Sequence, residues 1–138
     1  AGLPFEESLT AYGAFSIESG KEMMKALWEN NNPRPDAVFA VTDKIAIGAM
    51  EYLRKQGVNV PGDCMVAGVG NNKLSEFVSP PLSTIEFFYD ELGSMVTDSL
   101  LSAVESGESV QGVHVMRHRI IERESTNGKN PDTGGAAD

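Results

Sequence analysis

The sequence predicts an α/β protein built on a doubly wound parallel sheet. Short apolar runs alternate with amphipathic helical stretches, and turn-forming Gly, Pro and Asn residues separate them. Size agrees with this class, because 138 residues with 41% hydrophobic content suffice for the core of one domain or one lobe of a larger domain. The only repeat in the sequence is this alternation of strands and helices.

The first unit is a short strand over 10–15, TAYGAF, followed by the helical stretch SIESGKEMMKALWENN. Met24 and Trp28 stand four residues apart in that helix, so both are expected in the core rather than in a ligand site. Ser16 or Ser19 can cap the helix, since a hydroxyl at this point accepts from a free backbone N–H. The segment NNNPRP ends it.

The alternation repeats through the middle of the chain. Residues 36–41, DAVFAV, predict a second strand, and Asp43 is the expected cap of a helix that runs to Gly57. This helix carries more apolar surface than one sheet face needs, so a second face is expected to meet another surface. CMVAGV over 64–69 predicts a third strand, and NKLSEFV a short helix that two prolines stop.

The last part of the chain continues the pattern and ends in a polar segment. LSTIEFF over 82–88 predicts a fourth strand, followed by a helix capped by Asp90 and closed by Gly107. VHVMRHRII over 113–121 predicts a fifth strand. Residues 126–138 have almost no apolar content, which predicts a disordered tail.

Charge and composition exclude several classes of function. The formal net charge is −9, so the surface as a whole would repel a phosphate backbone, and this segment alone should not bind DNA. The single cysteine, Cys64, lies in an apolar run and is expected to be buried, with no disulfide, zinc or redox role. No apolar run reaches the length of a membrane span and no basic leader is present. Ala1 is not a natural start, which leaves room for a leader or a domain upstream.

Three kinds of chemistry find little support. The stretch VAGVGNNK lacks the third glycine of a dinucleotide fingerprint and the spacing of a P-loop. His114 and His118 would stand roughly 13 Å apart along a strand, too far to share one metal ion. No nucleophile elbow, zinc-protease motif or Cys–His pair indicates catalysis. We therefore expect no catalytic residue, no metal and no cofactor.

A binding site is expected where the parallel strands end, because the ligand crevice of a doubly wound sheet lies outside their carboxyl ends. Phe15, Thr42, Asp43, Gly70 and Asn71 occupy those ends. An aromatic ring packs on the C–H face of a sugar, and hydroxyl, carboxylate and amide groups satisfy its hydroxyls. This set predicts a polyhydroxylated ligand, although singly the carboxylate could be only a helix cap and the amide only a turn former.

Several ordered motifs resemble the lactose and galactose repressor family of transcription regulators. They are PDAVFAVTDKIAIGAMEYLRKQGVNVPGDCMVAGVGNN, LSEFVSPPLSTI, ELGSMVTDSLLSAVESGE and IIERES. The resemblance covers nearly all of residues 1–125 and implies part of a core like a periplasmic binding protein. Residues 1–125 would be its C-terminal lobe, with a crossover strand and helix over 84–110 that pack on an N-terminal lobe absent from this sequence.

The resemblance implies a cytoplasmic homodimer that senses a small-molecule effector, a sugar or sugar phosphate. Effector binding would close two lobes and change operator affinity through a helix-turn-helix headpiece, also absent here. Two alternatives stay open: a periplasmic or secreted sugar-binding protein of a transport system, and an α/β sugar-modifying enzyme. The enzyme would need a nucleophile or an acid–base pair at the rim, which the sequence does not offer.

Roles carry over to five residues by position. Phe15 stands where the family places an aromatic against the effector ring, Thr42 where a polar side chain contacts the ligand, and Asp43 on the acidic residue that follows. Gly70 and Asn71 stand where many members carry two aspartates, so one expected carboxylate contact is missing. The Val-Gly-Asn sequence resembles trehalose and sucrose repressors, which favours a disaccharide or its phosphate.

The resemblance also implies a dimer contact made by the helix after the second strand and the short helix before the prolines. The expected interface residues are Ile47, Met50, Arg54, Leu74, Phe77 and Val78. A separate apolar stripe on the last helix would pack on the absent lobe. We expect this chain on its own to be oligomeric or domain-swapped through that stripe, which consists of Leu92, Val96, Leu100 and Val104.

Overall fold

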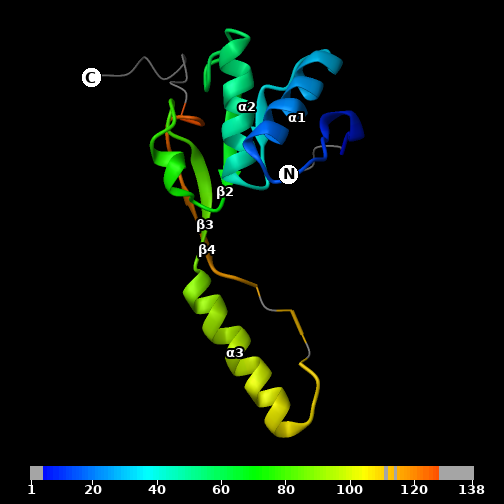
Figure 1. The fold of residues 1–138 in the computed structure, drawn as a ribbon, viewed down its shortest axis with the longest axis vertical. Helices are drawn as coiled ribbons and strands as arrows, with labels where there is room; N and C mark the ends of the chain where they lie inside the picture. The colour runs from blue at the N-terminus through cyan, green and yellow to red at the C-terminus, as the bar shows by residue number, and fades with distance from the viewer. Residues whose placement is uncertain (1–4, 111, 114, 128–138) are drawn as a thin grey trace, which may run out of the picture.

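A computed structural model describes residues 5–110, 112, 113 and 115–127, and arranges them as a compact body from which one long helix projects (Figure 1). The predicted alternation of helices and strands is confirmed. The elements in chain order are η1 (Glu7–Leu9), α1 (Ile17–Asn30), β1 (Ala37–Phe39), α2 (Asp43–Lys55), β2 (Met65–Val69), η2 (Lys73–Glu76), β3 (Ser83–Phe87), α3 (Tyr89–Ser106) and β4 (His118–Ile121).

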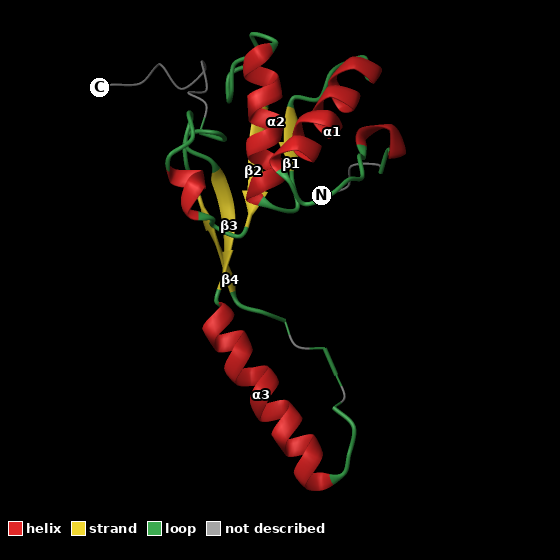
Figure 2. Cartoon of the chain, in the orientation of Figure 1, coloured by secondary structure: helices red, strands yellow, loops and turns green. Residues whose placement is uncertain are grey.

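The strands form one open mixed sheet in the order β1-β2-β3-β4. β1, β2 and β3 are parallel, and β4 pairs antiparallel with β3. The parallel α/β sheet is therefore as predicted, and β4 adds an antiparallel strand at its edge. Helices α1 and α2 lie side by side in front of β1 and β2 (Figure 2).

The core fills the space between α2, α1 and the sheet. Met24 and Trp28 are buried as predicted, at 1% and 6% exposure. Cys64 is also fully buried. Burial, together with the nearby charges of Asp36 and Asp63, raises the pKa of its thiol to about 11. The thiol therefore stays protonated near neutral pH and behaves as a small apolar side chain.

Helix ends differ from the predictions at two places. Ser16 caps α1 and Thr42 caps α2, each hydroxyl accepting from a backbone amide three residues on, at 3.1 and 3.4 Å. The prediction that Asp43 caps α2 is wrong, because Asp43 is the first residue of the helix and its side chain points elsewhere. The prediction that Asp90 caps α3 is also wrong: Phe88 precedes the helix, without a side-chain cap bond.

Residues 10–15 are not a strand, contrary to the sequence prediction. A Cβ atom at Gly13 would overlap the Ser19 hydroxyl and stand 3.0 Å from the Met23 sulfur. The absence of a side chain thus lets this segment run against α1 instead of pairing with the edge of β1. β4 is shorter than the predicted strand over 113–121, and His114 lies outside the described residues.

The segment after β4 returns to the body and joins β2 to β3. Ser125 is fully buried; its hydroxyl donates to the Val66 carbonyl (2.6 Å) and accepts from the Ser83 amide (2.8 Å). The hydroxyls of Thr126 and Ser83 are 2.6 Å apart. Order therefore continues through Thr126, the first residue of the predicted tail, while residues 128–138 of that tail lie outside the described residues.

Helix α3 leaves the body between β3 and β4 and does not fold back onto the sheet (Figure 1). None of its residues is buried. Val96, Leu100 and Val104, three members of the apolar stripe, are 47%, 56% and 80% exposed. The stripe thus has no cover within the described chain, which is the arrangement expected of a helix that packs on another lobe or another chain.

The crossing of α1 and α2 depends on two glycines. A Cβ atom at Gly20 would overlap the backbone of Ile45, and one at Gly48 would overlap the carbonyl oxygen of Ile17. The two helices therefore approach more closely than any side chain at these positions would allow. This contact fixes the start of α1, and with it the segment that ends in Phe15, against the first turns of α2.

Gly48→Ala is predicted to destabilise the chain by about 1–3 kcal/mol, because the added methyl group must push α1 away from α2. Gly93→Ala on α3 is the matched control, since open space surrounds that position. It should leave stability unchanged or raise it by up to about 1 kcal/mol through helix propensity. Urea unfolding followed by circular dichroism measures both, and equal effects of the two substitutions would contradict the close crossing.

Candidate functional site

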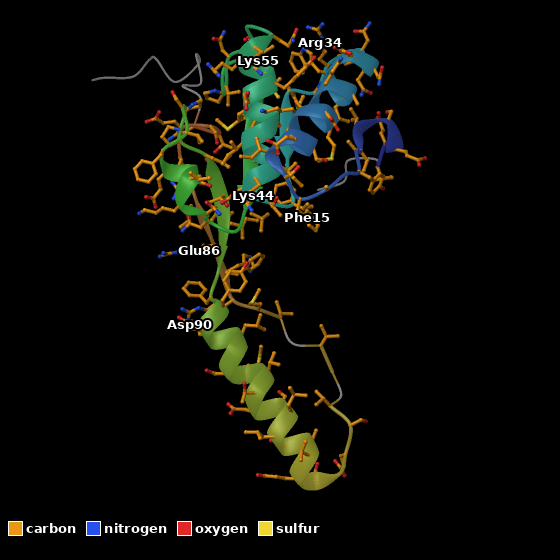
Figure 3. All side chains as sticks on the ribbon, in the orientation of Figure 1. Phe15, Arg34, Lys44, Lys55, Glu86 and Asp90 are labelled. Carbon is orange, nitrogen blue, oxygen red and sulfur yellow. The ribbon has the colours of Figure 1, made fainter. Side chains whose placement is uncertain are left out.

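The carboxyl ends of the three parallel strands meet at one end of the body, the end from which α3 leaves. Figure 3 shows Phe15, Lys44 and Glu86 at this end, and Arg34 and Lys55 at the opposite end. The loops that follow β1 and β2 therefore lie next to each other, as they must in a parallel sheet. We call this end of the sheet the rim.

The buried carboxylate of Asp43 holds the rim together. Asp43 is 2% exposed, and its Oδ2 accepts from the Asn72 amide (2.6 Å) and the Ser75 hydroxyl (2.8 Å). Its Oδ1 accepts from the Thr84 hydroxyl (2.6 Å). The first turn of α2 is thereby joined to the loop after β2 and to β3. Three protein donors surround this buried carboxylate, so it holds the segments of the rim together and is not exposed for direct contact with a ligand.

Gly68, the first glycine of VAGVGNNK, makes room for that carboxylate. A Cβ atom there would overlap Asp43 Oδ1 and stand 3.2 Å from Cβ of Ala46. Gly70 and Asn71 follow with φ of 119° and 47°, a left-handed turn that costs little for Gly and is tolerated by Asn. Gly68 is therefore needed for close packing, and Gly70 for the turn of the backbone.

The loop after β2 is not a phosphate cradle. The amide of Gly70 donates to a β3 carbonyl (2.8 Å), that of Asn71 to the Thr84 hydroxyl (3.2 Å) and that of Asn72 to Asp43. A phosphate site needs successive free N–H groups, and all three here have protein acceptors. The weak support that the sequence gave to nucleotide binding is thus removed by the geometry of the loop.

The side chain of Asn71 is engaged at both ends. Its Nδ2 donates to Glu86 Oε1 (3.0 Å), and its Oδ1 accepts from Arg123 Nη2 (2.8 Å). The other oxygen of Glu86 accepts from Arg119 Nε. Hydrogen bonds from Asn71 and then from Arg119 hold the pKa of the Glu86 carboxyl below its usual value. A ligand that uses the Asn71 carboxamide would have to share it with these two partners.

Phe15 is the most accessible member of the predicted site. Its side chain is 71% exposed, and Thr42, whose hydroxyl accepts the capping bond of α2, is half-buried. Gly70 adds no side chain, so the space in front of it is open. The structure thus brings Thr42, Asp43, Gly70 and Asn71 together at the rim, with the aromatic ring of Phe15 on the α1 side.

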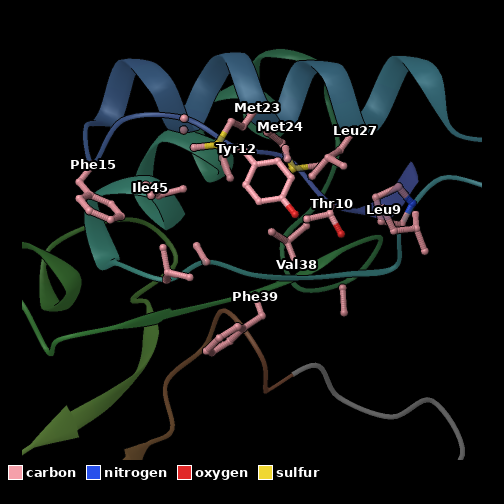
Figure 4. Close-up of a pocket in the computed structure, with 18 of the residues that line it drawn as sticks. Leu9, Thr10, Tyr12, Phe15, Met23, Met24, Leu27, Val38, Phe39 and Ile45 are labelled. Carbon is pink, nitrogen blue, oxygen red and sulfur yellow. The ribbon is translucent and has the colours of Figure 1, made fainter. Parts of the chain in front are cut away.

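A cavity of about 610 Å³ adjoins Phe15 on the outer side of β1. Figure 4 shows it beneath α1, with Phe15 at one end, Leu9 at the other and the Tyr12 ring above Val38. Its walls are mainly apolar and come from α1, from residues 9–15 and from 35–41. This is the space that remains because residues 10–15 follow α1 instead of pairing with β1.

Sequence reasoning missed several residues that shape the rim. A signal was available for one group, because polar residues inside the otherwise apolar run LSTIEFF indicated buried hydrogen-bond partners. The two arginines gave no signal, since basic residues at a strand edge are ordinarily solvated. The missed residues are Ser75, Thr84, Glu86, Arg119 and Arg123.

The predicted interface residues divide into buried and accessible sets. Met50 is 5% exposed and belongs to the core, and Ile47 and Val78 are partly buried against it. Leu74 and Phe77, on and just after η2, are 50% and 73% exposed. Arg54 is also exposed. The accessible apolar surface of the predicted interface is therefore the pair on η2.

Metal and membrane features are absent from the part of the chain that the structure describes. No cluster of three or more His, Cys, Asp or Glu side chains stands there in a metal-binding arrangement. His118 is exposed and packs edge-on against Phe87, with ring centroids 6.4 Å apart. Across the same residues, no helix has the length and apolar content needed to cross a membrane.

Comparison with known proteins identifies the family. A model of the periplasmic binding protein-like domain matches residues 1–126. Catabolite control protein A of Priestia megaterium is 35% identical over 128 residues, which cover 91% of this chain and 38% of that protein. The chain belongs to the lactose and galactose repressor family. Its α/β fold with a rim at the strand ends is the fold of that family's periplasmic-binding-protein-like core.

Solved structures of repressor-family regulators agree with the fold. A complex described as transcriptional regulator CelR with cellobiose superposes with a TM-score of 0.79 at 28% identity, covering 90% of this chain and 38% of that one. A regulator of the same family from Arthrobacter sp. FB24, in complex with lactose, superposes with a TM-score of 0.66 at 28% identity, covering 80% and 41%. This chain spans less than half the length of each of these proteins.

Asp43→Asn is predicted to lower stability by about 3 kcal/mol, because an amide NH2 would replace an acceptor that faces buried donors. Asp98→Asn, the same substitution at an exposed position on α3, should change stability by less than about 0.5 kcal/mol. Chemical denaturation of both variants is the measurement. Equal stabilities of the two variants would show that the carboxylate is not an anchor.

Proposed function

We propose that this chain is the sugar-sensing part of a transcription repressor, with the effector seated on the rim. The observation that carries the proposal is a preorganised rim in a chain of this family. Asp43 and the loop amides are satisfied internally, while the ring of Phe15 is exposed and Thr42 is half-buried beside it at the strand ends. A site that is rigid before the ligand arrives loses little entropy on binding.

The chemistry of the rim favours an uncharged disaccharide over a sugar phosphate. The exposed Phe15 ring offers a platform for the C–H face of a pyranose, and Thr42 offers a hydroxyl donor. The amides of 70–72 are occupied, and the carboxylates of Asp43 and Glu86 lie beneath and beside the loop, so an added phosphate would find no free backbone donors in this loop. The related structures with cellobiose and lactose support the same ligand class.

Gly70 adjusts the size of the site. Where relatives are expected to place a carboxylate, this chain has no side chain, and no atom lies within 4 Å of the position that a Cβ atom would take. Hydroxyls of the ligand would then be met by Thr42 and by water rather than by a carboxylate at this position. We therefore expect a bulkier ligand, or one with fewer hydroxyl contacts on this side, than relatives with an aspartate take.

The remaining parts of the proposal concern the longer protein. The exposed stripe of α3 would pack on the other lobe of the core, and a homodimer formed through η2 and α2 would align two DNA-binding headpieces on a two-fold operator. Effector binding would shift the relation of the lobes and change operator affinity. Such a regulator works in the cytoplasm, where its operator is.

Calorimetric titration of the intact protein that carries this chain tests the site. We expect one member of a panel containing cellobiose, lactose, trehalose and sucrose to bind, and Phe15→Ala to weaken that binding roughly tenfold by removing the stacking surface. Phe5→Ala is the matched control, because this aromatic side chain is 80% exposed and is neither a predicted site residue nor a predicted interface residue. Binding that is unaffected by Phe15→Ala would remove the rim from the site.

The dimer is tested by placing charges on η2. Leu74→Asp with Phe77→Asp should convert a dimer to a monomer in sedimentation, because both side chains are exposed in the free chain and would be desolvated in the interface. Phe5→Asp, at a position that is 80% exposed outside η2, should leave the dimer intact. An unchanged dimer in the double variant would place the interface elsewhere.

A further inference from the structure

Glu86 stands where the rim meets the strands that lead to α3. It is the penultimate residue of β3, lies on the same face of the sheet as Thr84, and is opposite Arg119 in the antiparallel register with β4. Its side chain is 26% exposed. The rim loop and β4 therefore both come within reach of one carboxylate.

The two oxygens of Glu86 are divided between these neighbours. Oε1 accepts from Asn71 Nδ2 on the rim loop (3.0 Å), and Oε2 accepts from Arg119 Nε on β4. Asn71 and Arg119 thus share a partner at the two ends of one rigid, planar group. If Arg119 moves while keeping its bond to Oε2, the whole carboxylate moves with it. Oε1 then shifts as well, and so does the Asn71 carboxamide that donates to it.

Arg123 strengthens the link from the chain that follows β4. Its guanidinium donates to the Asn71 Oδ1 (2.8 Å) and to the Leu82 carbonyl (2.8 Å), and its side chain is only 14% exposed. Asn71 has a positive φ, so the conformation of the loop depends on contacts that hold it there. Both contacts of its side chain come from β3 and from the segment around β4.

β3 and β4 are also the strands from which α3 projects (Figure 1). Beyond the sheet, the guanidinium of Arg117 lies 4.2 Å from the centre of the Phe88 ring, and Arg117 pairs with Glu91 on the first turn of α3 (3.1 Å). Arg119 also lies over Phe88, at 5.8 Å. A change in the direction of α3 would therefore act first on Arg117, which precedes β4, and on Arg119 of β4.

We propose that Glu86 is a positioning residue that couples the rim loop to the edge strand β4. Through it, the orientation of α3 sets the conformation of Asn71 and of the amide of Asn72, and a ligand on the rim biases α3 in return, since such coupling is reciprocal. The coupling itself stands on the contacts of this chain. Its role in sensing rests on the proposed function.

Hydrogen exchange of the full chain without any sugar tests the coupling. Arg119→Met keeps most of the stem but removes the donor to Glu86, and should raise the amide exchange of Asn71 and Asn72 by about tenfold. Arg117→Met is the matched control, because Arg117 contacts Phe88 and Glu91 but has no bond to Glu86. It should change exchange in the loop by less than about twofold.

The same measurement in a Glu86→Ala background separates coupling from general loosening. There Arg119→Met should have no further effect on the loop, since the shared partner is gone. Glu86→Gln keeps an acceptor for Asn71 and replaces Glu86→Ala if that variant does not fold. In this background the Asn71 amide should still exchange slowly, and Arg119→Met should raise its exchange rate less than in the unmodified chain.

An effect of Arg119→Met no larger than that of Arg117→Met, or one that persists without Glu86, would overturn the proposal. A chain that shows the coupling but binds no sugar would instead contradict the proposed function.

Discussion

The carboxylate of Asp43 is the interaction on which the rim depends. Three strands end at this side of the sheet, and each loop must keep its position while one face of it remains open to solvent. A buried acceptor that takes donors from Asn72, Ser75 and Thr84 ties the start of α2 to two of these segments at once. Removing it would leave three donors without a hydrogen-bond partner, so substitutions at this position are expected to lower stability.

Packing decides how much of this arrangement could be predicted. The strand and helix units, the buried Met24 and Trp28, and the convergence of Thr42 with Gly70 follow from periodicity and from the geometry of parallel sheets. The role of Asp43 did not, because a carboxylate at a helix start is compatible with a cap, and only Gly68 beneath it reveals the space in which it is buried. Its partners come from 29 to 41 residues further along the chain, beyond the reach of local patterns.

The wrong prediction of a strand over 10–15 also arises from tertiary packing that local sequence patterns do not show. Its residues have strand propensity, but Gly13 lets the backbone lie against α1, and among the described residues no strand pairs with the outer edge of β1 beside the cavity. Propensity describes what a segment can form, and the neighbour it meets decides the outcome. The long, exposed α3 is the opposite case, because its apolar stripe was predicted from helical periodicity alone. No residue that the structure describes covers this stripe, which fits a helix whose partner is another lobe or another chain.

The exchange rate of the Asn72 amide in the unmodified chain tests this account most directly. Asn72 is an exposed loop residue, so its N–H would ordinarily exchange as fast as that of an unstructured peptide. If Asp43 anchors the rim, that amide is protected at least about a hundredfold, as strongly as the amides of neighbouring β2. Exchange at the unprotected rate would show that the bond to Asp43 does not persist in solution, and the rim would then have no fixed centre.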